Sequence, residues 1–275
     1  MKHIDDTFLL SEHFYSPQCE GYTTGVSAYF IRVAGCNLSC GVSRDKVREI
    51  KRAPKGTFEL EDVDDLRQEG KATWVCDSVL EWLHGERIHF DALADEWEEL
   101  GIKDWVGDQI VHLIFTGGEP TTLRNQYTYV KFLQHLQERY GESFIPYTEI
   151  ETNGTQVLTD DFFARIQQIN CSPKLSNSGM PKERRIVPDA IKRIMEHPNY
   201  WFKFVVSGED SVQEYIKEYV EPFNIPHKKV LMMPAEENVD NFHENTRMVL
   251  ELTKKYGFRG MQRMHISAWD RTTGV

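Results

Sequence analysis

The chain has 275 residues, of which 40% are hydrophobic, enough to bury the core of one large α/β domain. Its formal net charge of −11 would repel a phosphate backbone, so the composition disfavours sequence-independent nucleic-acid binding and favours a small-molecule substrate. Five cysteines, no secretory leader pattern and no apolar run of bilayer length predict a cytoplasmic protein without a membrane span, whose thiols serve as ligands or core residues.

Six short apolar runs rich in β-branched residues predict strands, each ended by turn residues. They span 27–33, 110–117, 147–154, 166–174, 201–208 and 229–235. Segments with helical spacing lie between most of them, at 125–139, 159–165, 188–197, 210–220 and 240–256. Strands and helices in alternation predict a parallel sheet, and we expect residues 1–275 to form a single α/β domain.

One segment, 41–75, departs from this alternation because it is dense in charge and poor in large apolar residues. We interpret it as an insertion carried on the surface, with one or two short helices. A specific docking role is the alternative interpretation.

Ligand sites of parallel α/β sheets gather at the carboxyl ends of the strands, and polar motifs follow five of the six predicted strands. The motifs are GCNLSC (35–40), TGGEP (116–120), ETNGT (151–155), SPK (172–174) and MPAEEN (233–238). Three thiolates on a 4Fe-4S cluster would leave one iron open to a bound molecule, whereas Cys36 and Cys40 alone also suit buried core positions. The glycines of TGGEP allow close backbone approach to a ligand, and Glu119 can accept hydrogen bonds from an ammonium group.

A CxxxC motif after one strand and GGEP after the next resemble the radical S-adenosylmethionine (SAM) enzymes. That resemblance implies a partial (β/α)6 barrel of parallel strands and a 4Fe-4S cluster that binds SAM. In that family, reduction cleaves SAM to a 5′-deoxyadenosyl radical, which abstracts hydrogen from the substrate. The stretches EHFYSPQCEGYTTGVSAYFIRVAGCNLSC (12–40) and RMHISAWDRTTGV (263–275) narrow the resemblance to the 7-carboxy-7-deazaguanine synthases, skipping 41–74.

The resemblance also implies the metal ligands. The family's last cluster cysteine precedes Asp-Thr, and WVCDS (74–78) is the similar stretch, so Cys36, Cys40 and Cys76 would hold the cluster. Lengthening the loop between the last two cysteines to 35 residues costs about 2.5 kcal/mol of closure entropy, less than the roughly 10–16 kcal/mol that structural zinc contributes in peptides. Ser78 stands where the family has a threonine that binds Mg²⁺; a helix N-cap for 79–84 is its other interpretation.

Further site residues follow from the same resemblance. A carboxylated tetrahydropterin would be held by Pro17, Gln18, Cys19, Glu20, Arg32, Thr116, His265 and the terminal carboxylate of Val275. Residues expected to bind SAM are Val75, Cys76, Asp77, Gly117, Gly118, Glu119, Asn153, Ser172, Pro173, Lys174, Met233, Pro234, Ala235 and Glu236. No side chain is assigned a catalytic step of its own. Cys19 stands where the family has glycine, and we interpret it chiefly as a small residue of which only the backbone matters. We expect Cys171 to be a core residue.

The implied reaction is ring contraction of 6-carboxy-5,6,7,8-tetrahydropterin to 7-carboxy-7-deazaguanine with loss of ammonia, a step of queuosine and other 7-deazapurine biosynthesis. The reaction would need Mg²⁺ and an electron donor such as flavodoxin or ferredoxin. The resemblance also implies that the protein is a homodimer. Two alternatives stay open: a radical-SAM activase or peptide-modifying enzyme, and a non-catalytic protein that binds zinc through the three cysteines and a histidine.

Overall fold

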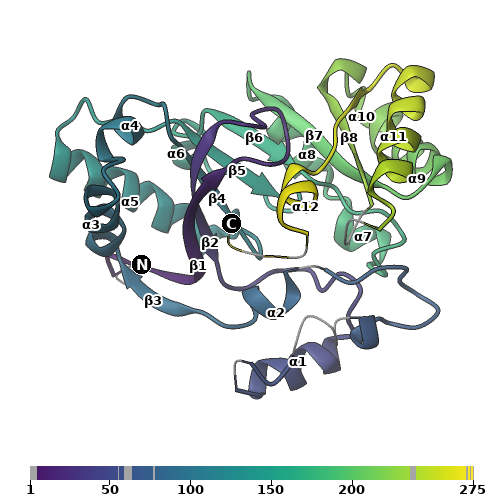
Figure 1. The fold of residues 1–275 in the computed structure, drawn as a ribbon, viewed down its shortest axis with the longest axis horizontal. Coiled ribbons are helices and arrows are strands. Elements are labelled where there is room, and N and C mark those ends of the chain that lie inside the picture. The colour runs from purple at the N-terminus through teal and green to yellow at the C-terminus, as the bar shows by residue number, and fades with distance from the viewer. Residues whose placement is uncertain are drawn as a thin grey trace.

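A curved, mostly parallel sheet organises the chain (Figure 1). The computed structural model describes residues 5–54, 56–58, 64–76, 78–235, 240–270, 272 and 274, and within them one sheet has the strand order β3-β1-β2-β4-β5-β6-β7-β8-β9. The strands are β1 (Thr7–Pro17), β2 (Ser27–Val33), β3 (Glu86–His89), β4 (His112–Gly117), β5 (Thr148–Thr152), β6 (Gln168–Cys171), β7 (Tyr200–Val206), β8 (Val230–Pro234) and β9 (Arg259–Gly260).

The predicted α/β fold with a parallel sheet is confirmed. Neighbouring strands from β2 through β4 to β9 pair in parallel, while β1 is antiparallel to both β2 and β3. The six predicted strands are β2 and β4 to β8, and β1, β3 and β9 were not predicted. The strand-end motifs therefore do lie at one edge of the sheet.

Helices connect the strands and cover the sheet. They are α1 (Arg44–Arg52), α2 (Val79–Trp82), α3 (Phe90–Glu99), α4 (Lys103–Gly107), α5 (Leu123–Tyr140), α6 (Asp160–Phe163), α7 (Lys182–Arg185), α8 (Pro188–Met195), α9 (Glu209–Tyr215), α10 (Glu221–Phe223), α11 (Phe242–Tyr256) and α12 (Met264–Trp269). A π-helical turn, Ile216–Val220, joins α9 to α10, and 3-10 turns span Asp64–Leu66 and His227–Lys229. The five predicted helical segments coincide with α5, α6, α8, α9 with its π turn, and α11. No helix in the described ranges has the length and hydropathy to cross a bilayer.

Alternation along the strands separates an apolar face from a polar one. Ile31, Phe115 and Phe202 point to one face of the sheet and join one large core. The neighbours on the opposite face include Arg32 and Thr116, which are register partners across β2 and β4. Polar side chains thus line the inner face of the sheet, where a substrate would lie.

The insertion 41–75 contains α1 and the 3-10 turn Asp64–Leu66, as the prediction of one or two short helices required. It is more than a solvated loop, because it forms a second, smaller apolar cluster together with α2. That cluster consists of Val42, Ile50, Leu66, Val75, Val79, Trp82 and Leu83, and Cys36 and Cys76 pack against it. In Figure 1, α1 lies away from the main sheet, beyond α2.

Candidate active site

The three predicted cluster cysteines come together just beyond the carboxyl end of β2. The backbone N–H of Cys76 donates to the carbonyl oxygen of Cys40 at 3.2 Å. Burial, then the nearby carboxylate of Glu119, and more weakly the thiols of Cys76 and Cys40 raise the pKa of Cys36. Cys76 therefore joins a common site with Cys36 and Cys40 although 35 residues intervene.

A close backbone approach at Gly41 returns the chain to this site. Gly41 has φ +80°, and a Cβ atom there would lie 2.2 Å from the carbonyl oxygen of Trp74 and 2.5 Å from Cα of Val75. Only glycine fits such a contact at this φ. Gly41 directly follows Cys40, and Trp74 and Val75 directly precede Cys76, so this contact brings the two cysteines close together.

Two kinds of metal site use thiols of this kind. A zinc site needs its four ligands around a single ion, whereas each cysteine of a three-cysteine 4Fe-4S cluster binds a different iron. In the part of the chain that the structure describes, no three side chains of His, Cys, Asp or Glu are grouped around one point as ligands of a single ion. The assignment of Cys36, Cys40 and Cys76 to a cluster stays a prediction.

The two glycines of TGGEP lie directly against the cluster loop. A Cβ atom on Gly118 would lie 2.1 Å from the carbonyl oxygen of Gly35 and 2.9 Å from the backbone nitrogen of Cys36. The N–H groups of Gly118 and Glu119 donate to the carbonyl oxygens of Val33 (3.0 Å) and Gly35 (2.9 Å). The loop after β4 is thereby fixed beside the cysteines.

The side chain of Glu119 is held by neighbouring residues of the protein. It is fully buried, and its carboxylate accepts hydrogen bonds from the N–H of Thr121 (2.9 Å), the hydroxyl of Thr152 (2.7 Å) and the N–H of Asn153 (2.8 Å). Burial raises its pKa, although these hydrogen bonds act in the opposite direction. The carboxylate therefore ties β4 to β5, and its contact with the ammonium group of SAM stays a prediction.

The remaining residues expected to bind SAM lie along the same edge. Asn153 donates to Asn37 of the cluster loop at 2.9 Å, and the N–H of Ser172 donates to the carbonyl oxygen of Thr152 at 2.7 Å. Pro173 and Lys174 follow Ser172, while Met233 and Pro234 end β8 and are followed by Ala235. Asp77 and Glu236 lie outside the described residues.

Ser78 occupies the N-cap position of α2, but its side chain makes no capping hydrogen bond. Its hydroxyl oxygen instead lies 3.4 Å from the sulfur of Cys76. The hydroxyl is thus beside the cluster site, where a Mg²⁺ ligand was expected.

A buried polar network occupies the inner face of the sheet. Lys203, only 4% exposed, places its ammonium 2.9 Å from Glu20 and 3.1 Å from Glu151. Arg263 reaches Glu20 at 2.7 Å, and His265 lies 3.8 Å from the same oxygen. Burial favours a raised pKa for Glu20, but the positive charges of Lys203, Arg263 and His265 outweigh it and hold the pKa well below its usual value.

Two more predicted substrate residues join the network through Glu151. Thr116 donates to this carboxylate at 2.9 Å, and Gln18 lies 3.4 Å from it. The structure therefore brings together Gln18, Glu20, Thr116 and His265, four residues of the predicted substrate set. Sequence reasoning missed Glu151, Lys203 and Arg263. A lysine inside the apolar stretch WFKFVV (201–206) was the available signal.

Arg32 has a protein partner. Its Nε donates to Glu12 at 2.5 Å, from the directly opposite position on β1. The two side chains form an ion pair, although the Arg32 side chain stays about one-fifth exposed.

The remaining residues expected to bind the substrate are Pro17, Cys19 and Val275. Cys19 is buried with its sulfur 3.4 Å from the carbonyl oxygen of Pro17, as suits a small residue, and Pro17 ends β1. Val275 lies outside the described residues. Its neighbour Gly274 lies close to Glu12, because a Cβ atom on Gly274 would be 3.5 Å from the Glu12 carboxylate.

Comparison with known proteins agrees with these observations. No family model matches the chain. Similar curated proteins are the 7-carboxy-7-deazaguanine synthases of Pyrobaculum aerophilum (27% identical, 96% of this chain and 95% of the relative), Aquifex aeolicus (27%, 96% and 95%) and Rhodopirellula baltica (25%, 98% and 90%). The crystal structure of QueE from Escherichia coli superposes with a TM-score of 0.55 at 20% identity and covers 93% of both chains. The resemblance seen in the motifs is thus confirmed: over nearly its whole length the chain is similar to 7-carboxy-7-deazaguanine synthases, and it shares the fold of QueE.

Proposed function

We propose that the protein is a 7-carboxy-7-deazaguanine synthase, which contracts the ring of 6-carboxy-5,6,7,8-tetrahydropterin with loss of ammonia. The main support for this proposal is the position of the buried polar network relative to the three cysteines. The network of Glu20, Glu151 and Lys203 lies on the inner face of the sheet, whose strand ends carry the three clustered cysteines and the glycine backbone of TGGEP. The named relatives, similar over almost the full chain, support the same reaction.

Each part of the site has a task that its chemistry suits. Cys36, Cys40 and Cys76 would hold a 4Fe-4S cluster, and SAM bound to its open iron supplies, on reduction, the radical that takes a hydrogen from the substrate. Lys203 and Arg263 keep Glu20 ionised, so that its carboxylate can accept the N–H groups of the pterin.

Arg32 suits the carboxylate of the substrate. The hydrogen bond to Glu12 comes from Nε of Arg32. The two terminal guanidinium nitrogens would bind the carboxylate of the substrate.

The proposal includes Mg²⁺ held by Ser78, an electron donor such as flavodoxin or ferredoxin, and a homodimer. The product would enter 7-deazapurine and queuosine biosynthesis, and no nucleic acid would bind the enzyme itself. All five cysteines are free thiols, and an oxygen-sensitive cluster on three of them calls for a reducing, cytoplasmic setting.

Anaerobic turnover tests the function. The purified protein, reconstituted with iron and sulfide, is expected to convert carboxytetrahydropterin to the deazaguanine product when SAM and a reductant are supplied. A protein that cleaves SAM but leaves the pterin intact would favour the activase alternative. A colourless protein that contains zinc would contradict both the synthase and the activase hypotheses.

Extending the chain beyond Val275 is expected to weaken substrate binding roughly ten- to a hundredfold. The reason is that a terminal carboxylate makes charge-assisted hydrogen bonds worth about 1.5–3 kcal/mol, and an extension replaces it with a neutral amide. The position of Gly274 against Glu12, the partner of Arg32, supports this role. The measurement compares KM for the pterin between the chain that ends at Val275, a short C-terminal extension and an N-terminal extension. Equal values for all three would show the terminus to be inert.

A further inference from the structure

The loop between β6 and α7, residues 172–179, is bound to the cluster segment on one side. Ser178 accepts a hydrogen bond from the N–H of Gly41 at 2.8 Å, and Asn177 accepts one from the indole of Trp74 at 3.1 Å. Gly41 follows one cluster cysteine and Trp74 lies two residues before another. This loop, which begins with the expected SAM contacts, is therefore tied to the cluster cysteines through backbone and indole hydrogen bonds.

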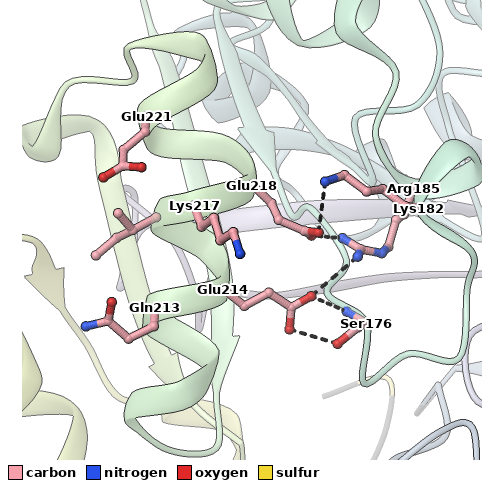
Figure 2. Close-up of a pocket in the computed structure, with 9 residues that line it drawn as sticks. Ser176, Lys182, Arg185, Gln213, Glu214, Lys217, Glu218 and Glu221 are labelled. Carbon is pink, nitrogen blue, oxygen red and sulfur yellow. Dashed lines mark hydrogen bonds and ion pairs between the residues drawn. The ribbon is translucent and has the colours of Figure 1, made fainter.

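The other side of the loop is held by the helical segment after β7. Glu214 accepts hydrogen bonds from both the N–H (2.7 Å) and the hydroxyl (2.8 Å) of Ser176, as Figure 2 shows. The hydroxyl of Tyr219 donates to the carbonyl oxygen of Lys174 at 2.8 Å, and Arg185 reaches the same oxygen at 3.4 Å. Both ends of the segment 174–176 are thus fixed by side chains.

The π-helical turn explains how one short segment supplies these contacts. Residues 216–220 are π-helical, so the turn holds more residues than an α-helical turn and aligns positions about four to five apart. Glu214, Glu218 and Tyr219 can then share one face. Glu218 pairs with the buried Arg185, whose guanidinium also lies 3.4 Å from Glu214 (Figure 2).

Polar and apolar contacts share the support of the loop on this side. Between the loop, α7 and the π turn lies an open cavity of about 770 Å³, lined by charged residues that include Lys182, Lys217 and Glu221. Leu175 is buried in the main core, while the flanking residues, Lys174 and Ser176, are held by the hydrogen bonds to Tyr219 and Glu214.

We infer that Glu214 and Tyr219 are positioning residues for the cofactor: presented together by the π turn, they hold the 172–179 loop in the conformation that binds SAM. Neither residue touches the reacting atoms. The inference rests on the proposed function in one respect, that SAM is the molecule this loop binds.

A matched pair of tyrosines provides the main test. Tyr215 and Tyr219 are both fully buried, and their rings stack at a centroid distance of 5.3 Å. The Tyr219 hydroxyl meets the carbonyl oxygen of Lys174, whereas the Tyr215 hydroxyl has no hydrogen-bond partner among the described residues. Tyr219→Phe is expected to raise the Kd and KM for SAM about tenfold, because the carbonyl of Lys174 loses its closer donor and keeps only the longer contact with Arg185, while KM for the pterin stays unchanged. Tyr215→Phe is expected to change neither constant.

A second pair tests the carboxylate. Glu214→Ala is expected to speed amide hydrogen exchange at Ser176 roughly tenfold or more and to raise KM for SAM, because the N–H loses a charged acceptor. Glu221→Ala is the control, since Glu221 is an exposed glutamate that lines the same cavity. Unchanged exchange and unchanged SAM affinity in Tyr219→Phe and Glu214→Ala would overturn the inference.

Hydrogen exchange separates this inference from the proposed function, because it is measured without cofactors. A wild-type protein that converts the pterin while the variants bind SAM normally would overturn only the positioning role. A wild-type protein that binds no SAM would overturn the proposed function and the cofactor role of the loop together, even if exchange showed the loop to be held as described.

Discussion

Replacing Cys76 with alanine is expected to remove most of the iron and sulfide from the reconstituted protein and to abolish turnover. Cys76 contacts the Cys40 backbone and shares the site of Cys36, so two thiolates would be left for a cluster that needs three. Iron and sulfide per chain, together with visible absorption after anaerobic reconstitution, are the measurements. Cys36→Ala and Cys40→Ala are expected to behave alike.

The control for this prediction is Cys171→Ala. Cys171 is fully buried in the main core, as predicted, and burial raises the pKa of its thiol. Its sulfur would lie 2.5 Å from a Cβ atom built on Gly154, so it fills space against the ETNGT turn. We expect this variant to keep its cluster at some cost in stability. A Cys76→Ala protein that still bound a full cluster and cleaved SAM would show that the third ligand lies elsewhere.

Lys203→Met is expected to lower the free energy of unfolding by about 3–5 kcal/mol at neutral pH. The change leaves the carboxylates of Glu20 and Glu151 on the inner face of the sheet without the charge between them. Urea unfolding at pH 7 measures the effect. Lys228→Met is the control, because Lys228 is exposed and its replacement should cost less than about 0.5 kcal/mol.

The pH dependence of the same variant gives a second check. In the wild type the pKa of Glu20 is held well below its usual value, so Glu20 contributes stability that is present above the unfolded pKa of about 4.3 and lost as pH falls through the folded pKa. The difference between Lys203→Met and wild type should therefore be largest at neutral pH and shrink below about pH 4. Adding Glu151→Gln to Lys203→Met should restore part of the stability. A pH-independent loss without such compensation would mean that Lys203 acts only through packing.

The sequence predicted the parts of the fold that depend on local pattern. Buried strands of a parallel sheet are continuous apolar runs, so β2 and β4 to β8 were found from the sequence. The edge strand β3, ERIH, is mostly exposed and carries no such signal. In β1, apolar and polar residues mix because the strand lies between an edge and the sheet, and it was not predicted.

The candidate site shows where local pattern stops being informative. Glu151 and Lys203 meet across the intervening strand β6, and nothing within either segment indicates that pairing. The sequence also could not show that Glu12 stands opposite Arg32 in the register of β1 and β2. The TGGEP motif identified Glu119 but could not show that its side chain is fully buried.

The contact of Gly41 with Trp74 also has a practical use. It places the entrance and exit of the insertion side by side, and a β-bridge between Val42 and Arg67 reinforces the junction. Adjacent ends are the geometry in which a foreign domain can be grafted into a protein without pulling its host apart. A fluorescent domain in place of the outer part of the insertion is therefore expected to leave these paired ends undisturbed.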